Sequence, residues 1–263
     1  MVVIPRITIA ILSYNYERYI EIAIESAVRQ KPGNYILQEI LVVDDGSTDD
    51  TIRVIQKYPN VRCLYRRHEG FAATLSCVVE EARGEWIAFL DADDEFLPDK
   101  LKYISPFLNE ENLLFLQHAE YVVDAEGKPF AEGTHPGGAT STLIVKRSAA
   151  KDLLPVTNEM FFHLLNDAGH GMKLKEPLTR YRVHDGSMTD RRTPGVFSDY
   201  VAVVCEAVTS RLLRMSEMPP SWASSSELFR LAGLYQAKAL KFRERSRRER
   251  ANIALPTTGE KFK

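Results

Sequence analysis

The first half of the chain alternates between short apolar runs and segments with helical periodicity. Mostly apolar runs predict buried strands at residues 7–12, 39–43, 61–65 and 86–90. After the first run, apolar residues recur at the spacing of one helix face, at Ile20, Ala23, Ile24, Ala27 and Val28. Alternating strands and helices with short loops are typical of right-handed crossovers. The predicted fold class is therefore α/β, with a Rossmann-like, mainly parallel sheet flanked by helices.

The second half is less regular and ends in helical patterns over 197–215 and 225–250. A chain of 263 residues can form one large α/β domain and a small appendage. We therefore expect one domain over residues 1–190, followed over 191–263 by a helical C-terminal extension with a basic tail.

Overall charge and cysteine usage exclude several classes of protein. The net charge of −2 argues against a nucleic-acid-binding surface. Three cysteines without a CxxC pair fit reduced thiols better than disulfides or a zinc site. The apolar start, residues 1–12, is too short for a signal peptide, and no run reaches the roughly 18 apolar residues of a spanning helix. A cytoplasmic protein is expected, and its oligomeric state stays open, with a homo-oligomer allowed.

Polar clusters follow three of the predicted strands, at residues 13–15, 44–50 and 91–95. Ligands of open α/β sheets bind at the carboxyl ends of the strands. Because these ends lie side by side in a parallel sheet, we expect the clusters to converge and to form the functional site.

The third cluster places Asp91, Asp93 and Asp94 directly after an apolar strand. Like charges this close repel each other, and a buried carboxylate needs a compensating partner. A turn at Ala92 would bring Asp91 and Asp93 toward one hard cation, Mg²⁺ or Mn²⁺, which usually also holds substrate phosphates. The alternative is a solvated loop before a helix that starts near Pro98.

Two other positions allow both a functional and a structural interpretation. In the second cluster, Asp44 and Asp45 could form a turn that caps the next helix, or one carboxylate could accept the N–H of a nucleotide base such as uracil. His184 could complete a metal site with two carboxylates, although a lone histidine is more often structural.

Four stretches, in order, resemble family-two glycosyltransferases of the GT-A fold: ILSYNYERYIEIAIESAVRQ, EILVVDDGSTDDT, EARGEWIAFLDADDEFLPDKL and LTRYRVHDGSMT. The resemblance covers about residues 6 to 190. It implies transfer of a sugar from a nucleotide-sugar donor, with UDP favoured and thymine or guanine nucleotides left open. It also implies that Asp45 reads the uracil and that Tyr14 lies beside the base. The nucleotide-binding residues implied in this way are Leu12, Tyr14, Glu17, Asp45, Arg67, Asp91 and Ala92.

The same resemblance implies a metal-dependent enzyme. Asp91 and Asp93 match the D-x-D motif, and His184 matches a histidine that completes the metal site, with Mn²⁺ or Mg²⁺ as the cofactor. Gly137 and Gly138 stand in the loop that lines the donor sugar and the acceptor. The implied acceptor is a glycan or a lipid-linked glycan, in bacterial-type polysaccharide synthesis.

The catalytic base is where the chain departs from the family pattern. The family carries a Glu-Asp pair at a helix start, and here Asn158 and Glu159 stand in its place, at the start of a predicted helix over 158–171. Glu159 is the predicted base of an inverting transfer, with Asp167 as the fallback. A first-turn glutamate that complements the helix dipole is the structural alternative.

Other functions remain alternatives. A haloacid-dehalogenase-type phosphohydrolase also has a strand running into Asp-x-Asp, but on its first strand, and a sugar nucleotidyltransferase would need a Gly-rich N-terminal signature. A non-catalytic nucleotide-sugar-binding protein fits the departure at Asn158. The basic residues over 238–250 indicate a solvated helix or, in the sharper interpretation, peripheral contact with anionic lipid.

Overall fold

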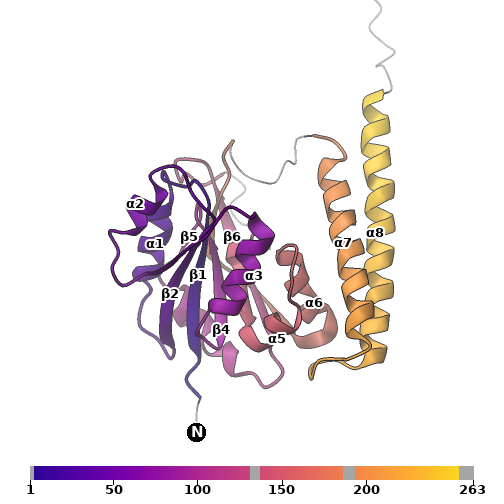
Figure 1. Ribbon diagram of the computed structural model, residues 1–263, viewed down its shortest axis with the longest axis horizontal. Helices are drawn as coiled ribbons and strands as arrows, with labels where there is room; N and C mark the ends of the chain where they lie inside the picture. Colours follow the sequence, from indigo (N-terminus) through magenta and orange to yellow (C-terminus); the bar gives the residue numbers. More distant parts are fainter. Residues whose placement is uncertain (1–2, 131–136, 186–192, 255–263) are drawn as a thin grey trace, which may run out of the picture. The chain divides into compact units, whose positions relative to one another are not determined.

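The computed structural model describes residues 3–130, 137–185 and 193–254. The chain divides into two compact units, with the boundary between His184 and Asp185. The first unit is an α/β layer structure and the second is a pair of long helices (Figure 1).

An eight-stranded sheet in the order β3-β2-β1-β4-β7-β6-β8-β5 forms the centre of the first unit. Its strands are β1 (Arg6–Ser13), β2 (Ile36–Asp44), β3 (Arg62–Tyr65), β4 (Trp86–Asp91), β5 (Glu95–Phe96), β6 (Phe115–Val123), β7 (Leu143–Lys146) and β8 (Gly171–Arg182). The first four pair in parallel, as do β6 and β8, whereas β7 runs antiparallel to β4 and β6, and β5 to β8. The mainly parallel α/β sheet is confirmed, and all four predicted strands overlap β1 to β4.

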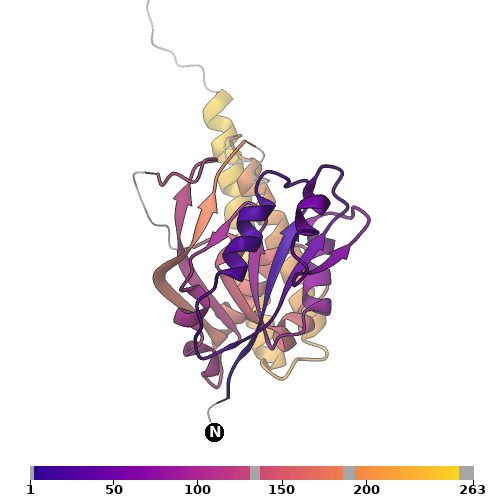
Figure 2. The same cartoon turned by 90° about the vertical axis from the view of Figure 1, so that its left-hand side faces the viewer.

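Helices cover both faces of this sheet. The α-helices of the first unit are α1 (Ile20–Val28), α2 (Thr51–Ile55), α3 (Phe71–Glu81), α4 (Lys100–Ile104), α5 (Arg147–Asp152) and α6 (His163–Leu165). Helices α1 and α2 lie on one side and α3 and α5 on the other (Figure 1). Figure 2 looks onto the first side, with α1 in front of the sheet.

The apolar stripe of α1 explains why it docks on the sheet. Ile20, Ala23, Ile24 and Ala27 are fully buried and join the core formed with β1 and β4. Val28, predicted on the same stripe, is instead 54% exposed because the helix ends there.

The predicted helix over 158–171 is broken into three short segments. A 3₁₀ turn, η3 (Glu159–Phe162), leads into α6, and a π-helical turn, η4 (Asn166–His170), follows. Gly169 has a φ of +93°, outside the helical region, which ends the helical path before β8. Two further 3₁₀ turns are η1 (Phe107–Asn109) and η2 (Thr140–Thr142).

The second unit contains α7 (Val196–Met215) and α8 (Ser225–Ala254), which correspond to the two helical ranges predicted at the end of the chain. The two helices run antiparallel, since Ser198 near the start of α7 donates to Glu249 near the end of α8 at 2.8 Å. Arg243 of α8 pairs with Glu206 of α7 at 3.0 Å, and Arg250 pairs with Asp199. Acidic residues of α7 therefore neutralise part of the basic segment.

Among the helices of the described ranges, none is both long and apolar enough to cross a bilayer.

Candidate active site

The strand register brings the predicted clusters to one edge of the sheet. Strand β1 lies between β2 and β4, so that Ser13 pairs with Asp44 and Leu12 pairs with Asp91. Past the strand ends, Asp45 N donates to the Ser13 carbonyl at 2.9 Å, and Ala92 N donates to the Leu12 carbonyl at 3.2 Å. Leu12 and Ala92 are buried and form the floor of this edge.

Asp94 has a full set of protein partners. Its carboxylate accepts a hydrogen bond from Ser141 Oγ at 2.5 Å and one from the backbone N–H of Arg182 at 2.8 Å. Ser141 Oγ also accepts from the N–H of Asp91 at 2.9 Å. Burial, followed by the charges of Asp93 and Asp91, raises the pKa of Asp94 well above its usual range. Asp94 is fully buried and therefore holds the turn together.

A buried lysine that the sequence did not reveal lies beneath this turn. Lys100 is fully buried, and its ammonium donates to the Ser141 carbonyl at 2.7 Å and to Thr179 Oγ1 at 3.3 Å. It also lies 3.3 Å from the centre of the Phe96 ring, a cation–π contact. Burial lowers the pKa of Lys100, and the charge of Asp94 raises it. Burial has the larger effect, and the pKa of Lys100 lies well below its usual range.

Asp93 and His184 are brought together from positions 91 residues apart. Asp93 Oδ2 lies 3.0 Å from His184 Nε2, and both side chains are nearly buried. Arg182 Nε donates to the carbonyl of Asp93 at 2.8 Å, and the His184 ring packs on Tyr19 with 5.0 Å between ring centres. Burial raises the pKa of Asp93, while the bond to His184 lowers it.

Asp91 and Glu159 form the other side of the cluster. Burial, then the charges of Asp93 and Glu159, raise the pKa of Asp91 well above its usual value, although a hydrogen bond with Thr140 opposes this. Burial also raises the pKa of Glu159. Glu159 is thus close enough to Asp91 for the two charges to interact.

The residues around Glu159 explain its position. Asn158 caps the η3 turn, since its side-chain oxygen accepts from Met160 N at 2.8 Å. Asp167, the fallback base, bonds with its neighbour Asn166 in η4, which leads into the start of β8. Since β8 begins at the opposite edge of the sheet, Asp167 lies away from this cluster.

The donor set at this edge fits a hard divalent cation. Within residues 3–130, 137–185 and 193–254, no three histidine, cysteine or acidic side chains gather into a complete metal site. The predicted trio is therefore assembled only in part, as the Asp93–His184 pair with Asp91 nearby. Mg²⁺ is commonly bound through one or two carboxylates together with waters and substrate phosphates. Carboxylate oxygens such as those of Asp93 are the ligand type that such an ion takes.

At the end of β2, the two aspartates have different partners. Asp44 accepts from Ser47 N at 2.9 Å and from Ser47 Oγ at 2.6 Å, so it stabilises a turn, as in the structural interpretation. Asp45 accepts from Glu69 N at 3.0 Å and from Gly70 N at 2.8 Å, and its Oδ2 lies 2.8 Å from His68 Nδ1.

Tyr14 and His68 form a stacked pair beside Asp45. Their ring centres are 4.0 Å apart and their planes differ by 19°. Tyr14 was predicted to lie beside a base, whereas His68 was missed, because the prediction for the stretch RRHEG concerned its arginines alone.

The other predicted nucleotide contacts are less direct. Glu17 Oε2 accepts from Asp50 N at 2.8 Å, and Glu17 N donates to Asp49 Oδ2 at 3.1 Å, so Glu17 ties the segment after β1 to the start of α2. Arg67 is exposed and precedes His68 in the loop.

The glycine loop is described only from Gly137 onward, and positions 133–136 lie outside the described residues. Gly137 has a φ of +92°, and a Cβ there would lie 2.3 Å from the His118 carbonyl oxygen. Only glycine allows the chain to pass this close to β6. A Cβ at Gly138 would lie within 4 Å of no other atom in the described part of the chain.

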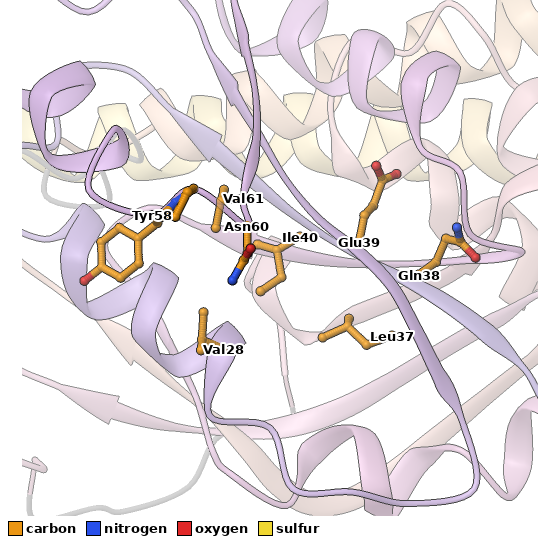
Figure 3. A pocket seen from close by; sticks show the side chains of 9 residues that line it. Val28, Leu37, Gln38, Glu39, Ile40, Tyr58, Asn60 and Val61 are labelled. Atoms are coloured by element: carbon orange, nitrogen blue, oxygen red, sulfur yellow. The ribbon is translucent and has the colours of Figure 1, made fainter.

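A separate pocket of about 360 Å³ lies elsewhere on the first unit. It is lined by the end of α1, the first half of β2 and residues 58–61, including Val28, Tyr58 and Asn60 (Figure 3). These segments are at the edge where β2 and β3 begin, opposite to the strand-end carboxylates. The pocket contains none of the predicted site residues.

The repulsion among the strand-end carboxylates predicts a stabilising substitution, Asp91→Asn. Folding raises the pKa of the Asp91 carboxyl above its value in the unfolded chain, which is about 3.9. The ionised carboxylate therefore destabilises the folded protein, and this effect grows as the pH rises from about 3.9 through the pKa of the folded state. In the presence of a chelator at about pH 8, Asp91→Asn should therefore have a higher urea midpoint than the natural protein. The difference between the two midpoints should become smaller toward about pH 5.

The control for this experiment is Asp99→Asn, which removes an exposed carboxylate. A midpoint for Asp91→Asn that is lower than that of the natural protein at both pH values would contradict the repulsion.

Comparisons with known proteins agree with this arrangement. The glycosyl transferase family 2 model matches residues 8–163. An Escherichia coli protein, the UDP-Glc:alpha-D-GlcNAc-diphosphoundecaprenol beta-1,3-glucosyltransferase WfaP, is 30% identical over 203 residues, covering 70% of this chain and 79% of that protein. Other curated relatives, uncharacterized glycosyltransferases of Rickettsia, are much longer, and the chain spans only 20 to 22% of their length.

Solved structures show the same fold at low sequence identity. Residues 1–349 of Staphylococcus aureus TarS in complex with UDP-GlcNAc match with a TM-score of 0.56 at 15% identity, covering 94% of this chain and 92% of that one. The Pyrobaculum calidifontis mannosyltransferase PcManGT, in complex with GDP-Man and Mn²⁺, matches with a TM-score of 0.57 at 14% identity, covering 98% and 76%. With the family model matching more than half of its length, the chain belongs to glycosyl transferase family 2 and has the GT-A fold.

Proposed function

We propose that this protein transfers a sugar from a nucleotide-sugar donor, a UDP-sugar, to an acceptor hydroxyl with inversion of configuration. The observation that carries the proposal is the cluster of Asp91, Asp93, His184 and Glu159 at the carboxyl edge of the sheet in a family 2 chain. The catalytic domain spans residues 1–190, and the helical extension spans 191–263.

The donor nucleotide has two contact regions in this proposal. Tyr14 presents a partly exposed ring and Asp45 a carboxylate, which suit the face and the imide N–H of uracil. The diphosphate lies toward Asp91 and Asp93 at the end of β4, which β1 separates from the end of β2. The TarS structure with UDP-GlcNAc supports a uridine donor.

A divalent cation, Mn²⁺ or Mg²⁺, is part of the proposed site. Asp93 and His184 would hold it, with Asp91 near enough to contribute. When bound, such an ion neutralises the negative charge that develops on the leaving diphosphate. The presence of Mn²⁺ in the PcManGT complex supports this choice.

Glu159 is the proposed base. Its raised pKa indicates a carboxylate that takes up a proton more readily than an exposed glutamate does. The acceptor oxygen attacks the anomeric carbon, its proton passes to Glu159, and the bond from that carbon to the diphosphate oxygen breaks with its electron pair on oxygen. Since the attack is on the face opposite to the leaving group, through an oxocarbenium-like transition state, the configuration inverts.

The acceptor is proposed to be a glycan or a lipid-linked glycan in bacterial-type polysaccharide synthesis, as the similarity to WfaP supports. Contact with anionic lipid would then bring the enzyme to its acceptor. On α8, Phe229 and Leu240 are 57% and 64% exposed, and Arg230, Lys241 and Arg247 are also exposed. Apolar side chains combined with basic ones suit an anionic membrane surface.

Calorimetric titration with UDP, GDP and dTDP, each with and without Mn²⁺, tests the proposed donor. We expect UDP to bind most tightly and to lose most of its affinity in a chelator, because a cation held by Asp93 would neutralise the charge of the diphosphate. Asp93→Asn should weaken UDP binding in Mn²⁺ and change it little in the chelator. If the folded protein bound no nucleoside diphosphate, the proposed function would be wrong.

Glu159→Gln tests the base, since it keeps the shape of the side chain but accepts no proton. We expect kcat for sugar transfer to fall about 10²- to 10⁴-fold, with UDP affinity unchanged. Glu111→Gln, on an exposed glutamate, serves as the control. Near-normal turnover of Glu159→Gln would assign the proton to another group.

Vesicle pelleting tests the lipid contact. The natural protein should bind vesicles with anionic lipid and release them at high salt, and Lys241→Glu with Arg247→Glu should weaken binding by at least about tenfold. A second double variant, Lys151→Glu with Lys175→Glu, reverses two exposed charges of the first unit as a matched control. Equal losses in both double variants would argue against a specific role of α8.

A further inference from the structure

The stack of His68 on Tyr14 occupies a place that the proposed function reserves for a nucleobase. The two rings are nearly parallel, with 4.0 Å between their centres, which is the geometry of a base on an aromatic side chain. His68 Nδ1 also lies 2.8 Å from Asp45 Oδ2 and 3.2 Å from the Asp45 carbonyl. The imidazole thus offers Tyr14 a flat face and offers Asp45 a ring N–H, the two features that uracil would present.

The backbone around His68 is fixed independently of its side chain. Arg66 N donates to the Asp44 carbonyl at 2.9 Å, and the N–H groups of Glu69 and Gly70 donate to Asp45. Gly46 permits this close approach, because a Cβ at Gly46 would lie 2.8 Å from the backbone nitrogen of His68 and its φ is +82°. The loop therefore stays in place whichever way the imidazole points.

The side chain of His68 has room to move. It is 53% exposed, so a rotation about its own side-chain bonds carries the ring into solvent. Asp45 would keep its two backbone donors, and a carboxylate has about four acceptor positions. One of these positions on Oδ2 becomes free for the N–H of a base when the imidazole leaves.

We propose that His68 closes the nucleobase site of the ligand-free protein: its imidazole stands in for the base between Tyr14 and Asp45, and the incoming base displaces it. This inference rests on the proposed function, since it assumes that Tyr14 and Asp45 receive the base. In this inference, the imidazole of His68 competes with the base of the donor for Tyr14 and Asp45. The competition favours bases that both stack on Tyr14 and donate an N–H to Asp45, as uracil does through its imide.

His68→Ala tests this proposal by calorimetry. In Mn²⁺, the Kd of UDP should fall about three- to tenfold, the range expected when the donor no longer has to break one aromatic pair. The Kd of inorganic pyrophosphate, which has no base, should not change. The control His170→Ala removes an imidazole next to the start of β8, at the opposite edge of the sheet, and should bind UDP like the natural protein.

Each other outcome has a definite meaning. If the natural protein binds UDP and His68→Ala binds it equally well or more weakly, the displacement of His68 is overturned and the proposed function stands. Weaker binding would make His68 a stacking partner of the base. An equal gain for pyrophosphate also overturns it, because the effect would not concern the base. If neither protein binds UDP, the proposed function fails and this inference fails with it.

A second measurement uses the natural protein and does not depend on a variant staying folded. The imidazole C–H signals of His68 should be shifted by the Tyr14 ring in the NMR spectrum of the ligand-free protein. Addition of UDP and Mg²⁺, which is diamagnetic, should move them to the positions of an exposed histidine. Signals that keep their shift at saturating UDP would overturn the displacement.

Discussion

The buried hydrogen bonds of Asp94 connect the parts of the first unit that the site requires. One carboxylate oxygen accepts from Ser141 of η2 and the other from the backbone of Arg182 in β8, while Ser141 also receives the N–H of Asp91. The end of β4, the turn before β7 and the end of β8 are thereby tied to one side chain. His184 follows Arg182 by two residues, so its position beside Asp93 depends on the same connection.

The three neighbouring carboxylates divide their tasks according to their surroundings. Asp94 is enclosed by the hydroxyl of Ser141 and the backbone N–H of Arg182, which satisfy its two oxygens within the protein. Asp93 has one imidazole partner, and Asp91 faces another acid, Glu159. Negative charge therefore accumulates where Asp91 faces Asp93 and Glu159, and a cation or a proton taken from a substrate would lower the electrostatic free energy there.

The fold could be predicted from the sequence to the extent that it depends on local periodicity. The apolar runs of β1 to β4 and the stripe of α1 have the strand and helix patterns that the structure shows, and the carboxyl-edge rule placed Asp45 and Asp91 together. The division of 158–171 into η3, α6 and η4 was not foreseen, because the sequence pattern predicts one continuous helix there. Lys100 and His68 were missed for a similar reason: a buried lysine and a stacked histidine depend on contacts with residues far away in the chain, which leave no periodic signal.

Strand order also has a consequence for synthesis of the protein. Strands β1 to β4 can pair as soon as the first 91 residues are available, whereas β5 pairs only with β8, whose residues are made some 80 positions later. Contacts this distant in sequence form late in folding because closing the intervening chain is entropically unfavourable. A nascent chain that ends before β8 lacks the N–H of Arg182 and the imidazole of His184, so its acidic turn has to stay hydrated. The hydrogen bonds that Asp93 and Asp94 receive from the end of the first unit form only when almost the whole unit has emerged from the ribosome.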